Sequence, residues 1–276
     1  MNRPLQAFAI ALCMTVAPSL HAATFTAYAE DHLDLAPPTP SNLIPTFTAT
    51  AVNWNWSRNF INAINTLGIT ASDDLAHPVS SANPLVRFSL VSMDVDGPDL
   101  LGMPDPFGQF SVLSERLSGS IRFTSQAGVL TARSTTLTLS DLRIDHQSNQ
   151  VLARIQNASG ATLATDLAVF QFDDTAYVLP QGSYIPVLTC LPTNPQCIAR
   201  VDGAESHPTL NNLRFTSQGQ ALWNEAFQLQ PIAVNAMKSL GSLGSLSAAP
   251  VPEPSTWAMV GIGLAGIGLA RRRQAS

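Results

Sequence analysis

Between residues 79 and 180, short segments of alternating or β-branched apolar residues are separated by turn-forming residues roughly every 8–12 positions. Further alternating segments occur at 24–28 and 46–49, on either side of a proline-rich stretch at 37–40. The pattern predicts a mainly β fold, an antiparallel sandwich-like body. The strongest segments are 85–95, 107–113, 119–125, 130–139, 151–156 and 168–172, and the turns between them are expected at 96–98, 126–128, 145–149 and 157–160.

One or two short helices are expected within this β-rich body. The first is predicted over 57–67, where Phe60, Ile61 and Ile64 recur at helical spacing. Ser57 stands at the N-cap position and Gly68 at the C-cap position. The second is predicted over 219–229.

The first 23 residues have the pattern of a secretory signal peptide. Arg3 and the amino terminus supply positive charge, an apolar run covers 5–16, and the small residues Ala22 and Ala23 offer a cleavage site. The apolar run is too short to span a bilayer. The sequence therefore predicts an exported protein whose mature body starts near residue 24.

The C-terminal end has three parts in order. Pro252, Glu253 and Pro254 precede an apolar, glycine-rich run at 256–270, and a basic cluster follows at Arg271, Arg272 and Arg273. A helix over 256–270 is expected to enter the membrane, with the arginines on the cytoplasmic side.

This three-part end closely resembles the PEP-CTERM sorting signal of Gram-negative bacteria. The resemblance implies that an exosortase-type membrane enzyme recognises residues 251–276 and cleaves near the Pro-Glu-Pro element. It further implies a membrane-anchored intermediate in the inner membrane, then delivery to the cell surface or to an extracellular polysaccharide (biofilm) matrix. A permanent single-span anchor is the alternative. Residues 239–250, rich in Gly, Ser and Leu, are interpreted as a flexible linker behind a body at 24–238, with a short adhesive segment as the other interpretation.

Charge argues against a nucleic-acid partner. Without the two terminal signals, residues 24–250 hold 10 basic and 18 acidic side chains, a net charge of −8. Such a surface lacks the clustered lysines and arginines that phosphate contacts need. Two cysteines remain in this body, Cys190 and Cys197, in a short proline-containing loop. Export favours a disulfide between them.

The sequence holds no convincing catalytic motif, so no enzyme is predicted and no catalytic residue is assigned. The histidines of the body are interpreted as structural: His77 and His207 precede prolines and are expected in loops, and the Asp145–His146 pair is expected on a solvated turn. The aromatic pair Trp54 and Trp56 fits a sugar-stacking platform, but core packing beside the first helix is the favoured interpretation.

The best metal candidate is an acidic segment. Asp94, Asp96 and Asp99 alternate with other residues ahead of Asp105, and alternating oxygens suit Ca²⁺. An ordinary turn at 96–98 is the alternative. Apart from calcium, no cofactor is predicted.

The body also resembles, faintly, the HtaA haem-binding surface domain of bacteria. The resemblance is carried by Trp54 with Phe60 after it, by 117–130 and by 137–145. It implies a β-rich sandwich with a tyrosine haem ligand on the first helix. The position of that ligand falls near Ala63, and the histidine of the family is replaced by Gln126. The resemblance therefore implies a shared scaffold without these axial ligands.

Together these features predict a non-enzymatic structural or adhesive protein of the cell surface or extracellular matrix. The alternative is a ligand-binding module for carbohydrate, calcium or a haem-like group.

Overall fold

The computed structural model describes residues 22–35, 43–48, 50–100, 103–105, 107–190, 197–203 and 207–250. Most of the expected signal peptide and all of the sorting tail at 251–276 lie outside these residues. Within the described part the chain is mainly β, as predicted. The strands are β1 (Ala22–Ala29), β2 (Leu43–Phe47), β3 (Thr50–Trp56), β4 (Ile69–Asp73), β5 (Pro78–Val79), β6 (Leu85–Leu100), β7 (Met103–Pro104), β8 (Phe110–Ser125), β9 (Thr135–Asp145), β10 (Gln150–Asn157), β11 (Thr162–Gln171), β12 (Val178–Leu179), β13 (Tyr184–Cys190), β14 (Cys197–Val201), β15 (Arg214–Phe215) and β16 (Gly244–Pro250).

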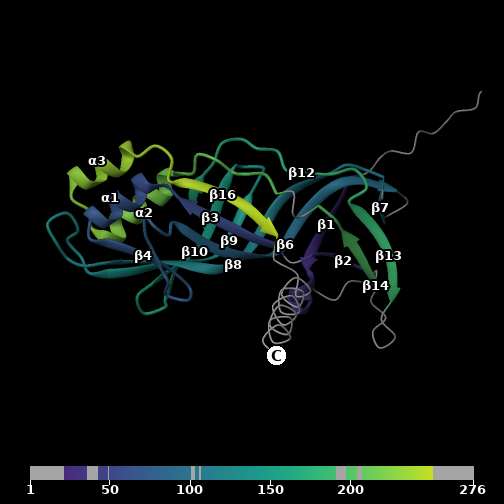
Figure 1. Cartoon of the computed structure of the whole chain (residues 1–276), viewed down its shortest axis with the longest axis horizontal. Coiled ribbons are helices and arrows are strands. Elements are labelled where there is room, and N and C mark those ends of the chain that lie inside the picture. Colours follow the sequence, from purple (N-terminus) through teal and green to yellow (C-terminus); the bar gives the residue numbers. More distant parts are fainter. Residues whose placement is uncertain are drawn as a thin grey trace, which may run out of the picture.

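The strands form one open, mixed sheet with the main order β13-β14-β2-β1-β6-β8-β9-β10-β11-β15. The pairs β1–β2 and β14–β2 are parallel, and the other described pairs are antiparallel. β6 changes partners along its length: its first half pairs with β3 and its second half with β1. β6 and β8 run through the middle of the molecule, and β1, β2, β13 and β14 gather towards one end (Figure 1).

The sheet folds back on itself to enclose the core. Trp54 and Trp56 of β3 are almost fully buried and stack on each other. Trp54 contacts Phe170 of β11 and Trp56 contacts Phe123 of β8, although β3 pairs with neither strand. These edge-to-face contacts bring β3 against β8 and β11 in the core of the single mixed sheet. The favoured interpretation of the tryptophan pair as core is confirmed.

In the described part of the chain, three α-helices and one 3-10 helix accompany the sheet, and the α-helices gather at the end away from β13 and β14 (Figure 1). The predicted first helix is α1 (Arg58–Thr66), whose N-cap Ser57 accepts a hydrogen bond from the backbone NH of Phe60. The predicted second helix is α2 (Ser217–Phe227), capped by Thr216. The sequence pattern missed α3 (Pro231–Ser239), which starts with proline at its first turn, and the 3-10 helix η1 (Glu30–Leu35). None of the described helices is long and apolar enough to cross a membrane.

The expected linker at 239–250 is largely a strand. Residues 239 and 240 end α3, and β16 pairs antiparallel with β3 from Gly244 opposite Trp56 to Pro250 opposite Thr50. Leu246 is fully buried on the core side. Gly244 has φ +148°, and a Cβ there would lie 2.2 Å from the carbonyl oxygen of Asn55, so glycine permits the close approach that starts the strand. The Gly/Ser-rich composition concealed this pairing.

The turn expected at 96–98 is also wrong, because β6 continues to Leu100. Gly97 pairs with Ala23 of β1. A Cβ on Gly97 would lie 2.1 Å from the buried ring of Phe110. The glycine therefore makes room for an aromatic ring inside the sheet rather than forming a turn.

Candidate functional site

A carboxylate faces the core from β8. Phe110 and Val112 point inward, and strict alternation would next turn Ser114 and Arg116 inward. The pairing of β8 with β6 shifts instead: Val112 lies opposite Val95, but Ser114 lies opposite Asp94, which leaves Leu113 as an extra residue. This β-bulge shifts the inward–outward alternation of β8 by one residue. Glu115 therefore points into the core, where its side chain has 0% exposure.

Two histidines from distant parts of the chain reach this carboxylate. His146 begins the turn after β9, and its backbone NH donates to the carbonyl oxygen of Leu113, which ties the turn to the bulge. The Asp145 carboxylate accepts hydrogen bonds from the backbone NH groups of Gln147 and Ser148 and fixes the turn. His207 lies shortly before Leu210, whose backbone pairs with Leu246 of β16.

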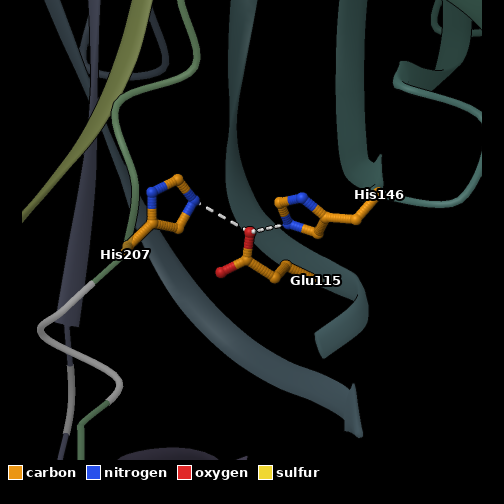
Figure 2. A group of neighbouring side chains, drawn as sticks. All are labelled: Glu115, His146 and His207. Carbon is orange, nitrogen blue, oxygen red and sulfur yellow. Dashed lines mark hydrogen bonds and ion pairs between the residues drawn. The ribbon is translucent and has the colours of Figure 1, made fainter. Parts of the chain in front are cut away.

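The three side chains meet at one carboxylate oxygen. Nε2 of His146 forms a hydrogen bond of 3.0 Å with Oε2 of Glu115. Nε2 of His207 lies 2.8 Å from the same oxygen, but its geometry does not meet the angular requirement of a hydrogen bond. Figure 2 shows the imidazoles on either side of the carboxylate. Each residue contributes one atom that could bind a metal ion, a ring nitrogen or a carboxylate oxygen, and these three atoms lie within 4.8 Å of one another. The side chains are 0%, 3% and 0% exposed for Glu115, His146 and His207.

Apolar and aromatic groups surround this Glu115–His146–His207 cluster. The Tyr177 ring centroid lies 5.7 Å from that of His146 and 5.4 Å from that of His207, and the Phe172 ring lies 5.9 Å from that of His146. The side chains of the cluster are almost inaccessible to water, so charge on one of them is compensated mainly by the others. Oε1 of Glu115 and Nδ1 of both histidines are buried without a hydrogen-bond partner.

Electrostatics favour an ion pair within the cluster. Burial alone raises the pKa of Glu115. The charge of His207 and the contacts with both imidazoles together have a larger opposite effect, and the net pKa is lowered to about 2. Burial lowers the pKa of His207, but the Glu115 carboxylate opposes this and the net pKa is raised. Glu115 is therefore ionised at neutral pH and favours a proton on His207.

Chemically, two imidazoles and a carboxylate are a ligand set for a borderline divalent metal ion. The side chains of all three residues are at most 3% exposed, so they lie beneath the surface of the described fold.

The sequence interpretation placed His146 on a solvated turn, and that is wrong: the backbone turn exists, but the imidazole points inward. His207 does lie in a loop before a proline, as expected, yet its side chain is buried. Glu115 was not singled out, because a carboxylate inside an apolar strand has no sequence signal apart from the broken alternation around Leu113 and Ser114.

The acidic segment proposed for calcium lies along β6 instead of a loop. Asp94 accepts hydrogen bonds from the hydroxyls of Thr26, at 2.7 Å, and Ser114, at 2.6 Å. Asp96 accepts one from Thr24 at 3.2 Å, and Asp99 lies opposite Pro104 of β7. Among the described residues, the one three-residue group suited to a metal is the Glu115–His146–His207 cluster.

Cys190 and Cys197 lie directly opposite each other in the antiparallel pair β13–β14. Opposed residues of such a pair have Cα atoms about 4.5–5.5 Å apart, within the range of a disulfide. Their side chains lie outside the described residues, so the disulfide stays a prediction.

Comparison with known proteins supports the interpretation of the C-terminus. Residues 250–274 match the PEP-CTERM protein-sorting motif. The motif marks the chain as an exported protein that is sorted by an exosortase and processed at the membrane. No curated protein and no solved structure gives a significant match, and the resemblance to HtaA stays unconfirmed.

Proposed function

We propose that the protein is a non-enzymatic structural or adhesive component of the cell surface or extracellular matrix, delivered there by its PEP-CTERM signal. The observation that carries the proposal is the junction between body and tail. β16 ends at Pro250, paired with Thr50 of β3, and the sorting motif begins at that residue. Cleavage near Pro252–Pro254 leaves every described strand intact. The body is therefore a complete folded cargo for the sorting signal.

Burial of the Glu115–His146–His207 cluster supports a role without catalysis. Glu115 and His207 have no exposed side-chain surface. Groups of this kind act on substrates when a cleft brings the substrate within hydrogen-bond reach. Here the strands and the rings of Tyr177 and Phe172 occupy that space.

A polar hollow on the solvent face of the sheet supports polysaccharide as the matrix partner. The hollow measures about 490 Å³ and crosses β8, β9 and β10. Its side chains are mainly hydroxyls and amides, which suit hydrogen bonding to sugar hydroxyls. Because the body has a net charge of −8, a neutral polymer fits it better than an anionic one. The lining residues are Ser120, Arg122, Thr136, Thr138, Ser140, Gln156, Asn157, Ala158 and Gly160.

Localisation tests the sorting half of the proposal. In a host with the matching exosortase, Glu253→Ala is expected to leave unprocessed chain in the membrane fraction, whereas the wild-type chain reaches the surface. Glu225→Ala, an exposed carboxylate on α2, is the matched control and should sort normally. Equal surface delivery of the Glu253→Ala chain and the wild-type chain contradicts the proposal.

Co-sedimentation tests the polysaccharide half. The full chain is mixed with neutral exopolysaccharide from the producing cells, and the pelleted fraction is measured. The double variant Arg122→Ala/Gln156→Ala should lose most of the pelleted protein. Arg133→Ala, an exposed arginine outside the hollow, should not. Absence of wild-type pelleting, or equal pelleting of all three chains, excludes polysaccharide binding by the hollow.

A further inference from the structure

We propose that Glu115, His146 and His207 bind one divalent transition-metal ion, with Zn²⁺ as the best fit, in a closed structural site. The three residues come from β8, from the turn after β9 and from the segment between β14 and β15. A bound ion would therefore cross-link three parts of the chain that are far apart in sequence.

The spacing of the ligand atoms fits such an ion. The two imidazole nitrogens lie 3.0 and 2.8 Å from Oε2 of Glu115, and the three atoms lie within 4.8 Å of one another. Around tetrahedral Zn²⁺, with bonds of about 2.0–2.2 Å, ligand atoms are about 3.3 Å apart. To reach that geometry, the two nitrogen–oxygen distances must lengthen by about 0.3–0.5 Å, and the widest separation, up to 4.8 Å, must shorten by up to about 1.5 Å through side-chain rotation.

The unpartnered atoms of the cluster supply the second argument. Oε1 of Glu115 is buried and accepts no hydrogen bond, and Nε2 of His207 approaches the carboxylate without hydrogen-bond alignment. A buried polar atom without a partner costs free energy. An ion bound by both carboxylate oxygens and both Nε2 atoms satisfies all of these atoms at once. The result is a distorted four-coordinate site without a water ligand, because the two oxygens of one carboxylate lie closer together than the other ligand atoms.

The kind of ion follows from the donors. Imidazole nitrogen suits Zn²⁺, Cu²⁺, Ni²⁺ and Fe²⁺, whereas Ca²⁺ takes 6–8 oxygens and Mg²⁺ keeps several waters. The side chains of the cluster are at most 3% exposed, which disfavours shells of that size. Binding displaces the proton from His207, so uptake of the ion should release protons.

Metal analysis of the full chain, purified in detergent, tests the site. After chelator treatment and exchange, titration with Zn²⁺ is expected to give one ion per chain and a higher Tm. His207→Ala should reduce the affinity for Zn²⁺ by more than about 100-fold. Changes to residues that only support a metal ligand typically cost about 10–100-fold. His77→Ala is the matched control, because His77 pairs with Asp73 at 2.9 Å but is 65% exposed. It should keep full binding. No stoichiometric binding by the wild-type chain, or equal binding by both variants, overturns the proposal.

X-ray absorption on the Zn²⁺-loaded wild-type chain keeps the test independent of how well the variants fold. The expected shell has two imidazole nitrogens and carboxylate oxygen at about 2.0–2.2 Å. Sulfur neighbours at about 2.3 Å would place the ion on cysteines instead. A shell without imidazole would place it on surface carboxylates. Either result refutes the assignment to this cluster.

Discussion

Glu115→Ala in the metal-free protein tests whether the buried cluster is held together by its one carboxylate. Glu115 is fully buried, and both imidazoles lie within 3.0 Å of its Oε2. Its removal leaves His207 without its opposite charge and His146 without its acceptor. Breaking a buried ion pair on one side costs about 3–5 kcal/mol. For a domain stable by about 5–15 kcal/mol, this is a large fraction of the free energy of unfolding.

Urea unfolding with chelator present measures this loss through the fluorescence of the core tryptophans, Trp54 and Trp223 among them. Asp73→Ala is the matched control: Asp73 contacts His77 at a similar distance, 2.9 Å, but the His77 side chain is 65% exposed. It should cost less than about 1 kcal/mol. Similar losses for Glu115→Ala and Asp73→Ala would refute the reasoning.

The pH dependence has a defined sign. The lowered pKa of Glu115 contributes stability that is fully present above the ordinary value of 4.5 and is lost as pH falls towards about 2. The raised pKa of His207 contributes stability that is present below 6.5 and is lost as pH rises through the folded-state pKa. The stability difference between wild type and Glu115→Gln should therefore shrink as the pH falls below 4.5. A difference that grows on acidification contradicts this.

Three further predictions concern the fold. Gly219→Ala should cost at least about 1–3 kcal/mol in urea unfolding, because its Cβ would lie 2.1 Å from the carbonyl oxygen of Val169, whereas Gly241→Ala, with open space, should be neutral. Leu246→Ala should cost about 2–5 kcal/mol, since the side chain is fully buried on β16; a loss near zero would indicate that β16 is a loose linker. Intact mass before and after reduction should show Cys190 and Cys197 as a disulfide, worth about 2–3 kcal/mol, and an unchanged mass would exclude it.

Local sequence signals predicted the elements that depend on local interactions. The Ser57 cap and the spacing of Phe60, Ile61 and Ile64 predicted α1 to within a residue or two. Alternation predicted the mainly β class because one face of each strand is buried. Composition was misleading where tertiary pairing decided the outcome. The Gly- and Ser-rich segment became β16 because Leu246 fills the core and Gly244 lets the strand approach β3.

The candidate site was beyond sequence reasoning for a different reason. The inward direction of Glu115 depends on a bulge at Leu113, which exists only in the pairing of β8 with β6. The meeting of His146 and His207 depends on sheet topology, and no spacing in the sequence encodes it. The polar turn around His146 correctly predicted the backbone, but the imidazole direction follows from its contact with Glu115.

The C-terminal residue of the protein recovered from the producing cells tests the central claim most directly. Mass spectrometry of surface-located protein should find a C-terminus near Pro252–Pro254, with all of β16 retained and the arginine cluster removed. Surface-located protein that still carries Arg271, Arg272 and Arg273 would contradict the account.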